Sequence, residues 1–376
     1  MDRLVKRPGE AALFSVFRGR RVLVTGHTGF KGSWLSQWLH MLGAEVAGYA
    51  LAPERATDLF HLLDLASRIH HVRADIRDGD RLREVFEEFQ PEFVFHLAAQ
   101  ALVRRSYVEP KRTFDTNAGG AVNLLEAIRA TSSVRAVVFV TSDKCYRNKE
   151  WIWGYRENDE LGGHDPYSAS KAVAELILAA YRDSFFRENV DLGIATARAG
   201  NVIGGGDRSP YRIVPDCLHA LRQGVPIVLR NPHATRPWQH VLDPLCGYLT
   251  LAAHLYEDPQ RYGGSWNFGP DADSIHTVRE VAERMVSFWG SGRIEVETQA
   301  NAPHEDGLLH LNCDKAQQML GWRLRWEFNR AIEEVVRWQQ EVDAGTSALE
   351  VTEAQIAAYA QGLPARRAAP VAGGAA

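Results

Sequence analysis

The first two hundred residues alternate short apolar runs with amphipathic stretches, and this alternation most constrains the fold. The runs are apolar nearly throughout, and strands that are apolar on both faces belong to parallel sheets with helices on both sides. The expected strands cover 20–25, 45–50, 69–75, 93–98, 136–142 and 192–198. The expected helices between them cover Lys31–Leu42, 79–89, 113–131 and 166–187. The sequence therefore predicts a doubly wound α/β domain.

Composition excludes several classes of protein. The 376 residues carry a formal net charge of −4, and 45% of them are hydrophobic, as in an ordinary globular protein. A nucleic-acid surface would need a clustered basic excess, and no apolar run approaches the roughly 18 residues that span a bilayer. The four cysteines form no CxxC pair, so no metal site is expected. The N-terminal segment lacks the features of a secretory signal, and a cytoplasmic location is expected.

A glycine-rich turn joins the first expected strand to the first expected helix. Such a turn bends sharply, lets the backbone approach a pyrophosphate and directs a helix N-terminus at it. Three glycines would also suit any tight turn, but their place in the first β-α unit favours a dinucleotide site. We therefore predict that a nicotinamide dinucleotide is held by residues of VLVTGHTGFKGSWL, namely Gly26, Thr28, Gly29, Phe30, Lys31 and Gly32.

Two strand ends are expected to complete the cofactor site. Asp75 and Ile76 follow the third strand, where a carboxylate can accept a hydrogen bond from the adenine amino group. Leu97, Ala98 and Ala99 follow the fourth strand, where small residues let the backbone pack beside the cofactor. Both segments stand in the order that a dinucleotide-binding sheet requires.

The choice between NAD and NADP stays open at this point. Sites selective for NAD usually carry an acidic residue at the end of the second strand, where it holds the ribose hydroxyls. No acidic residue ends this strand; Glu54 and Arg55 come slightly later. Because Arg55 is a candidate to accept a 2′-phosphate, the residues alone do not decide between the two cofactors.

The pattern changes after Ala199, where glycine and proline become frequent. We expect a dinucleotide-binding domain of the Rossmann type over 18–199, with 236–256 returning to it. A smaller C-terminal substrate-binding domain is expected over 200–235 and 257–345, including WNFGP (266–270) and helices near 277–289 and 328–343. The segment 365–376, ARRAAPVAGGAA, is expected to be a disordered tail.

A tyrosine and a lysine open the expected helix at 166–187. Tyr167 and Lys171 are four residues apart in DPYSASK and therefore share a helical face. The lysine ammonium and the positive nicotinamide are expected to lower the tyrosine pKa toward neutrality. The phenolate can then remove a hydroxyl proton while hydride leaves the same carbon. Such pairs are common on protein surfaces, but the upstream glycine turn and the fifth strand ending in Thr141-Ser142 favour catalysis.

Longer strings resemble one enzyme family. They are GHTGFKGSW, TSDKCYRNKEWIWGYRE, DPYSASK, ARAGNVIGGGD, RNPHATRPWQHV and WNFGP. On these strings, roughly residues 20–340 resemble the extended short-chain dehydrogenase/reductases. Within that family they resemble the nucleotide-sugar 4,6-dehydratases, most closely the branch that acts on CDP-glucose. The resemblance implies NAD as cofactor, CDP-glucose as the small-molecule substrate, and a role in deoxysugar or surface-polysaccharide (O-antigen) synthesis. It also implies a homodimer or higher homo-oligomer paired through the helices near 113–131 and 166–187.

The same resemblance implies a three-step reaction. The sugar is oxidised at carbon 4, water is eliminated across carbons 5 and 6, and hydride returns to carbon 6. Ser142 would orient the carbon-4 hydroxyl, and Asp143 would protonate the leaving hydroxyl. Lys144 stands where related enzymes have a glutamate base, and it must be partly neutral to act as one. Alternatively, Lys144 only binds substrate, and Asp143 or a water molecule moves both protons.

The second half of the chain supplies groups for a nucleoside diphosphate, which needs cations and amide donors. By resemblance, some of these groups contact the pyrophosphate and others border the sugar or the nucleotide ribose. They are Asn201, Arg212 and Arg236 for the pyrophosphate, Arg104 and Ser106 for the sugar, and Glu305 for the ribose. Trp151 and Trp153 lie in a loop near the expected substrate mouth, so they are candidates for contact as well.

Three alternatives remain open. The substrate of a 4,6-dehydratase could instead be dTDP-glucose or GDP-mannose. A nucleotide-sugar 4-epimerase would share Tyr167 and Lys171 but would have no use for the Asp143-Lys144 pair, because it eliminates no water. A catalytically silent NAD-binding regulator is disfavoured because both the tyrosine and the lysine are present.

Overall fold

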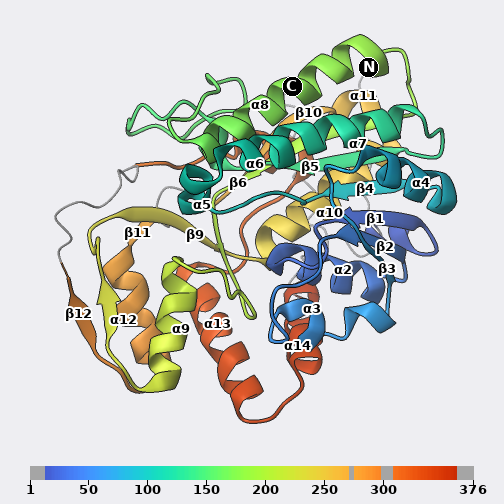
Figure 1. Cartoon of the computed structure of the whole chain (residues 1–376). Helices are drawn as coiled ribbons and strands as arrows, with labels where there is room; N and C mark the ends of the chain where they lie inside the picture. The colour runs from blue at the N-terminus through green and yellow to red at the C-terminus, as the bar shows by residue number, and fades with distance from the viewer. Residues whose placement is uncertain (1–12, 271–274, 298–307, 362–376) are drawn as a thin grey trace, which may run out of the picture.

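The structure, a computed structural model, describes residues 13–270, 275–297 and 308–361. Its main element is a sheet of seven strands in which every neighbouring pair runs parallel (Figure 1). The strand order is β10-β6-β5-β4-β1-β2-β3. The strands are β1 (Arg21–Thr25), β2 (Glu45–Ala50), β3 (His70–Arg73), β4 (Phe93–His96), β5 (Ala136–Val140), β6 (Gly193–Ala199) and β10 (Gly264–Phe268). All six strands predicted from the sequence are present.

Helices cover both faces of this sheet because alternate residues of each strand point to opposite sides. In β1, Val22 and Val24 join one apolar core and Leu23 joins the other. The first core lies under α2 (Phe30–Met41) and α10 (Leu242–Glu257). The second lies under α4 (Gly79–Phe89), α7 (Gly120–Arg129) and α8 (Pro166–Tyr181). The predicted doubly wound α/β fold is confirmed.

Two predicted helices are shorter than expected. The helix expected over 113–131 is broken, since α6 (Pro110–Phe114) passes through a π-helical turn at Asp115–Gly119 before α7 begins. The helix expected over 166–187 ends as α8 at Tyr181 and continues as a second π-helical turn. Such turns are local irregularities of hydrogen bonding, which hydrophobic periodicity does not reveal.

The seventh strand differs from the predicted domain organisation. WNFGP was assigned to the smaller domain, whereas the structure places Gly264–Phe268 at the edge of the main sheet, parallel to β6. The fully buried Trp266 and Phe268 side chains explain this position, since both join the core beneath α10. Within the segment 236–256, α10 packs on the core of the main sheet, whereas residues 236–240 belong to β9, a strand of another sheet.

A smaller group of elements lies beside the carboxyl edge of the sheet (Figure 1). Its strands are β7 (Asn201–Ile203), β9 (Thr235–His240) and β11 (Ile275–Thr277) in one sheet, with β8 (Ile227–Leu229) and β12 (Ile294–Val296) in another. Its helices are α9 (Ile213–Gln223), α12 (Val278–Trp289) and α13 (Phe328–Asp343). These elements share a third apolar core, so they form a packed unit of their own.

The last described helix, α14 (Ala348–Gln361), was not predicted. It packs against α2, where Gln37 Nε2 donates to Glu353 Oε1 at 2.7 Å.

The expected tail at 365–376 lies outside the described residues. Across the described ranges, every helix is too short or too polar to cross a membrane. The remaining short helices are α3 (Leu59–Leu62), α5 (Val103–Val108) and α11 (Pro259–Tyr262).

Candidate active site

A cavity of about 1730 Å³ opens at the carboxyl edge of the main sheet and extends to the smaller unit. The strand order reverses between β1 and β4, and ligands of such sheets bind at this point. The cavity is lined by every residue predicted to bind the cofactor: Gly26, Thr28, Gly29, Phe30, Lys31, Gly32, Asp75, Ile76, Leu97, Ala98, Ala99, Tyr167 and Lys171. It is also lined by the predicted Ser142, Asp143, Lys144, Arg104, Asn201, Arg212 and Arg236.

Two predicted substrate contacts are not among these residues. Ser106 is fully buried in α5, and its hydroxyl donates to the Val103 carbonyl at 2.7 Å. A helical serine commonly bonds back to its own helix in this way, so the prediction that Ser106 borders the sugar is corrected. Glu305 lies outside the described residues.

The glycine turn forms a cradle in which side chains have no room. Gly26 has φ +76°, and a Cβ there would lie 2.7 Å from the Ala98 nitrogen. A Cβ on Gly32 would overlap the Gly26 carbonyl oxygen. The turn is closed by a hydrogen bond from Gly29 N to Gly26 O (3.1 Å), and α2 begins immediately after it at Phe30. An exposed backbone turn leading into a helix N-terminus fits a dinucleotide pyrophosphate.

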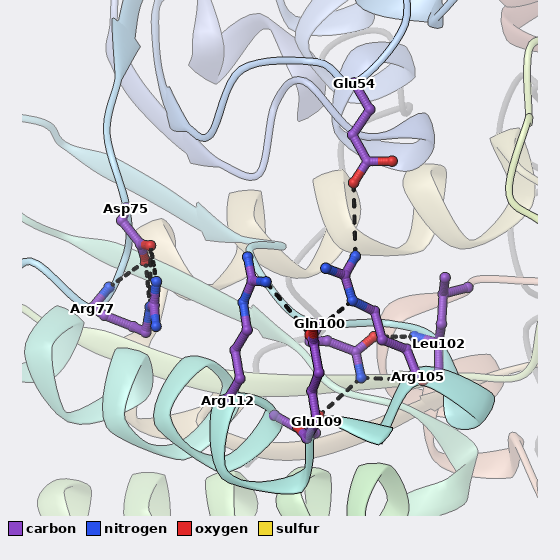
Figure 2. Close-up of polar contacts among 9 residues, drawn as sticks. Glu54, Asp75, Arg77, Gln100, Leu102, Arg105, Glu109 and Arg112 are labelled. Atoms are coloured by element: carbon purple, nitrogen blue, oxygen red, sulfur yellow. Dashed lines mark hydrogen bonds and ion pairs between the residues drawn. The ribbon is translucent and has the colours of Figure 1, made fainter. Parts of the chain in front are cut away.

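At the far end of the cradle, Asp75 is already paired. Figure 2 shows its carboxylate facing Arg77, whose Nη2 lies 2.6 Å from Oδ2 and whose Nε lies 3.1 Å from both carboxylate oxygens. This pairing lowers the pKa of Asp75. Arg77 also lines the cavity, although nothing in the sequence pattern singled it out. An adenine amino group would therefore meet an ionised carboxylate held in place by Arg77.

The candidate for a 2′-phosphate contact points elsewhere. Arg55 Nη1 donates to the Arg208 carbonyl at 2.9 Å, and the described cavity lining does not include Arg55. Beside the end of β2, Thr28 Oγ1 donates to the Leu51 carbonyl at 2.9 Å. The structure thus offers no support for Arg55 as a phosphate ligand.

An ion pair joins the loop after β2 to α5 (Figure 2). Glu54, in the loop after β2, lies 3.7 Å from Arg105 on α5. Glu109 also pairs with Arg105, since its Oε2 accepts a hydrogen bond from Arg105 Nε at 3.0 Å. The same carboxylate lies 3.4 Å from Arg112. Each partner of this ion pair follows a cavity-lining residue in the sequence: Leu51 precedes Glu54 by three residues, and Arg104 directly precedes Arg105. The pair therefore joins two segments that adjoin the cavity lining.

We expect Glu54→Gln to speed cofactor dissociation modestly. Exposed ion pairs contribute about 0–1 kcal/mol, so the off-rate should rise by no more than about fivefold. Stopped-flow displacement of bound NAD measures it. Added salt should reproduce the effect in the parent protein and leave Glu54→Gln unchanged. Equal salt sensitivity in both proteins would show that the pair does not hold the two segments together.

Tyr167 stands in the first turn of α8, behind Pro166 at the first helical position. Asp165 caps this helix, since its carboxylate accepts from the Ser168 amide at 3.0 Å. Burial raises the pKa of Tyr167 to about 12, although a hydrogen bond with Ser142 opposes the rise. Lys171 Nζ donates to the Val140 carbonyl at 3.3 Å. Burial is thus the largest influence on this pKa in the protein alone. That the lysine and a bound nicotinamide together lower it stays a prediction.

The catalytic turn, defined as Ser142–Cys145, follows β5 at the centre of the cavity. Ser142 Oγ donates to Asp143 Oδ1 at 2.9 Å and accepts from the Lys144 amide at 3.2 Å. Burial raises the pKa of Asp143, opposed by Lys144, the Ser142 hydrogen bond and Arg236. A buried carboxyl group that keeps its proton more readily is suited to donate it.

Two lysines are brought together at the junction of the cradle and the catalytic turn. The pKa of Lys31 is lowered to about 7, mainly by burial and also by the nearby charges of Lys171 and Arg212. Burial likewise lowers the pKa of Lys171 to about 8. Lys31 Nζ donates to the Tyr248 hydroxyl at 3.2 Å. Both lysines are thus poised to lose charge near neutral pH.

The lowered pKa of Lys31 makes the stability of the protein depend on pH. Because the pKa of Lys31 falls from 10.5 unfolded to about 7 folded, the unfolded chain binds more protons between these values, and stability should rise with pH there. We expect Lys31 to contribute about 2 kcal/mol to the increase in the free energy of unfolding from pH 7 to 9, with a smaller part from Lys171, and Lys31→Met to remove the Lys31 part. Urea denaturation at both pH values measures it. The exposed Lys111→Met is the control, and an unchanged slope in Lys31→Met would contradict the account.

The predicted substrate arginines surround the other half of the cavity. Arg212 lies 3.2 Å from the buried Asp207, and Arg236 Nη1 donates to the Thr235 carbonyl at 2.7 Å. Arg104 lies over the Tyr211 ring, 4.9 Å from its centre. Tyr211 is exposed, has φ +64° and lines the cavity. The sequence did not single it out, since it stands in a loop without periodicity.

The two tryptophans near the mouth have different surroundings. Trp151 stacks on Tyr155 with ring centres 5.2 Å apart, whereas the Trp153 side chain is exposed. Neither belongs to the described cavity lining, although Lys149 and Glu150 from the same loop do. Their expected contact with substrate stays a prediction.

Comparison with known proteins agrees with this arrangement. The family described as GDP-mannose 4,6 dehydratase matches residues 23–335. The chain is 45% identical to the CDP-glucose 4,6-dehydratase of Salmonella typhimurium over 91% of this chain and 97% of the relative.

Solved structures share the fold. The dTDP-glucose 4,6-dehydratase of Streptomyces venezuelae, solved with NAD bound, superposes with a TM-score of 0.74 at 26% identity and covers 86% of this chain and 98% of its own. The UDP-glucose 4-epimerase of Thermus thermophilus, also solved with NAD, gives 0.72 at 27% identity over 85% of this chain and 99% of its own. The chain therefore belongs to the GDP-mannose 4,6 dehydratase family, within the extended short-chain dehydrogenase/reductases.

Proposed function

We propose that this protein catalyses the NAD-dependent 4,6-dehydration of CDP-glucose to CDP-4-dehydro-6-deoxy-glucose. One observation carries the proposal: the catalytic turn with Asp143 and Lys144 shares a cavity with Tyr167 and Lys171. An epimerase needs the second pair alone, whereas elimination of water also needs an acid and a base. The identity of 45% to a CDP-glucose 4,6-dehydratase over nearly the whole chain supports the nucleotide.

The cofactor is NAD. The cradle at Gly26 and Gly32 has the shape for a dinucleotide, and the structural relatives from Streptomyces venezuelae and Thermus thermophilus were solved with NAD. When bound, the nicotinamide would supply a site that takes hydride from carbon 4 of the sugar and gives it back at carbon 6. The residues predicted for the cofactor site would hold and orient it.

The protein's own residues would then move the protons. Tyr167 would take the proton of the carbon-4 hydroxyl, with Ser142 orienting that hydroxyl. Asp143, which burial keeps protonated more readily, would protonate the leaving carbon-6 hydroxyl. Lys144 would remove the carbon-5 proton. No net oxidation results, because the same carbon skeleton is first oxidised and then reduced.

Cations of the smaller unit would hold the nucleotide diphosphate. Arg212, immediately before α9, Arg236 on β9 and Asn201 on β7 all line the cavity. Arginine suits phosphate because its planar group donates two parallel hydrogen bonds. Arg104, stacked on Tyr211, would border the sugar from the opposite wall.

A panel of nucleotide sugars tests the proposal. CDP-glucose, dTDP-glucose, GDP-mannose and UDP-glucose would each be incubated with the protein and added NAD or NADP. We expect CDP-glucose with NAD to give the alkali-induced absorbance of a 4-keto-6-deoxy sugar. Turnover of dTDP-glucose or GDP-mannose with none of CDP-glucose would overturn the nucleotide assignment while leaving the reaction type in place.

We also propose a homodimer or higher homo-oligomer, located in the cytoplasm. Both stretches predicted for pairing carry exposed apolar side chains, with Phe114 on α6 at 36% and Leu176 on α8 at 58% exposure. Apolar side chains gathered on helices in this way commonly mark an interface. Each of the four cysteines is a buried thiol, as suits a reducing compartment. Gel filtration that gives a monomer would contradict the oligomer.

A further inference from the structure

Behind the catalytic turn lies an ion pair that is almost completely inaccessible. The side chains of Glu175 and Arg198 are each 2% exposed, and Arg198 Nη2 lies 2.7 Å from Glu175 Oε2. A second bond from Arg198 Nε to Glu175 Oε1 (2.8 Å) makes the pair bidentate. Burying two charges is costly and is a weak source of stability, so such a pair calls for another role. Neither residue belongs to the described lining of the large cavity.

The ion pair is hydrogen-bonded to both residues that flank the catalytic turn, Thr141 and Tyr146. On one side, Thr141 Oγ1 donates to Glu175 Oε1 at 2.6 Å. On the other side, Arg198 Nη1 donates to the Tyr146 hydroxyl at 2.7 Å. The four residues of the turn stand between these two anchors. A displacement of the ion pair would therefore move the whole turn.

The same carboxylate belongs to the helix that carries the catalytic tyrosine. Glu175 lies on α8, four residues after Lys171 and eight after Tyr167, so the three side chains share one face. Thr196 Oγ1, on β6, donates to Glu175 Oε2 at 2.8 Å and ties the helix to the sheet. The helix and the catalytic turn, which come from distant parts of the chain, are thus linked through a single carboxylate.

We propose that the Glu175–Arg198 pair positions the catalytic turn against Tyr167, so that oxidation at carbon 4 and elimination across carbons 5 and 6 take place on one bound sugar. Thr141 and Tyr146 are positioning residues through which the pair acts. The proposal rests on the proposed function, because it takes Tyr167 on α8 as the base of the oxidation and Asp143 and Lys144 in the turn as the acid and base of the elimination. It predicts that a loosened turn slows elimination more than oxidation.

Two matched substitutions test it. Thr141→Val and Thr196→Val each remove one hydroxyl that donates to Glu175, but only Thr141 adjoins the catalytic turn. We expect similar losses of thermal stability from both. Thr141→Val should lower kcat by about 10- to 100-fold with KM unchanged, as expected for misplaced catalytic groups. It should also accumulate reduced cofactor during turnover. Thr196→Val should keep the parent kcat, and Thr141→Ser should restore it.

Equal kcat losses in Thr141→Val and Thr196→Val would overturn the proposal, as would a Thr141→Val protein with the parent kcat. If Thr141→Val does not fold, Tyr146→Phe replaces it, because it removes the acceptor at the other end of the turn. The same loss of kcat and build-up of reduced cofactor is then expected, and their absence would overturn the proposal. Failure of the proposed function would appear separately, as a parent protein that does not turn over CDP-glucose.

Discussion

Tyr167→Phe should lower kcat for CDP-glucose by about 10²- to 10⁴-fold, the contribution of a positioned general base. The substitution removes one oxygen from a buried side chain and leaves the ring in place, so folding should be unaffected. Binding of the sugar nucleotide should also be nearly unchanged, because the arginines proposed for it lie on other elements. The loss should therefore be in kcat and not in KM.

The loss should fall on the first chemical step. Without the phenolate, no proton leaves the carbon-4 hydroxyl, so mixing Tyr167→Phe with substrate should produce no reduced cofactor. Tyr181→Phe is the matched control, since it removes a hydroxyl from the other end of the same helix, where that group donates to Glu126 at 2.8 Å. A Tyr167→Phe protein that keeps more than a tenth of the parent kcat would exclude Tyr167 as the base.

Gly32→Ala should abolish tight cofactor binding. The added Cβ would overlap the Gly26 carbonyl oxygen, which is backbone and cannot rotate away. The Gly26 amide is itself fixed by a 2.9 Å hydrogen bond to the Tyr49 carbonyl on β2. Overpacking of this kind costs about 1–3 kcal/mol, so NAD affinity should fall by about 10- to 100-fold or the turn should open altogether.

Titration calorimetry with NAD, together with thermal unfolding, would measure both outcomes. Gly119→Ala serves as the control, since a Cβ there meets nothing within 4 Å. It should bind NAD as the parent does. If Gly32→Ala did the same, the turn could not be the pyrophosphate cradle.

The fold was predictable where local pattern decides it. The strands of the first half are apolar on both faces, and each predicted one is present. WNFGP was assigned to the smaller domain, and not to the main sheet, because Trp266 and Phe268 are apolar enough for the core of either unit. Only its pairing with β6, which joins residues far apart in sequence, determines its place. The π-helical turn before α7 and the docking of α14 against α2 likewise depend on contacts that periodicity does not describe.

The site was predictable where a motif fixes backbone geometry. The glycines and the Tyr167–Lys171 pair are such cases, and both line the cavity. The Ser106 prediction was wrong because the hydroxyl of a helical serine can donate its hydrogen bond to a carbonyl of its own helix, here that of Val103. The raised pKa of Tyr167 in the protein alone was not predicted, because the burial of its hydroxyl depends on the whole fold. Glu175 and Arg198 were missed, since no spacing reveals that two residues on α8 and β6 meet behind a turn from β5.

The central claim is that hydride leaves carbon 4 and returns to carbon 6 of the same sugar. CDP-glucose carrying deuterium at carbon 4 tests it most directly, with the product analysed by NMR after turnover in ordinary water. We expect deuterium at carbon 6, none at carbon 5 and no net reduction of NAD. A product that keeps deuterium at carbon 4 with inverted configuration, or one with no deuterium at carbon 6, would contradict it.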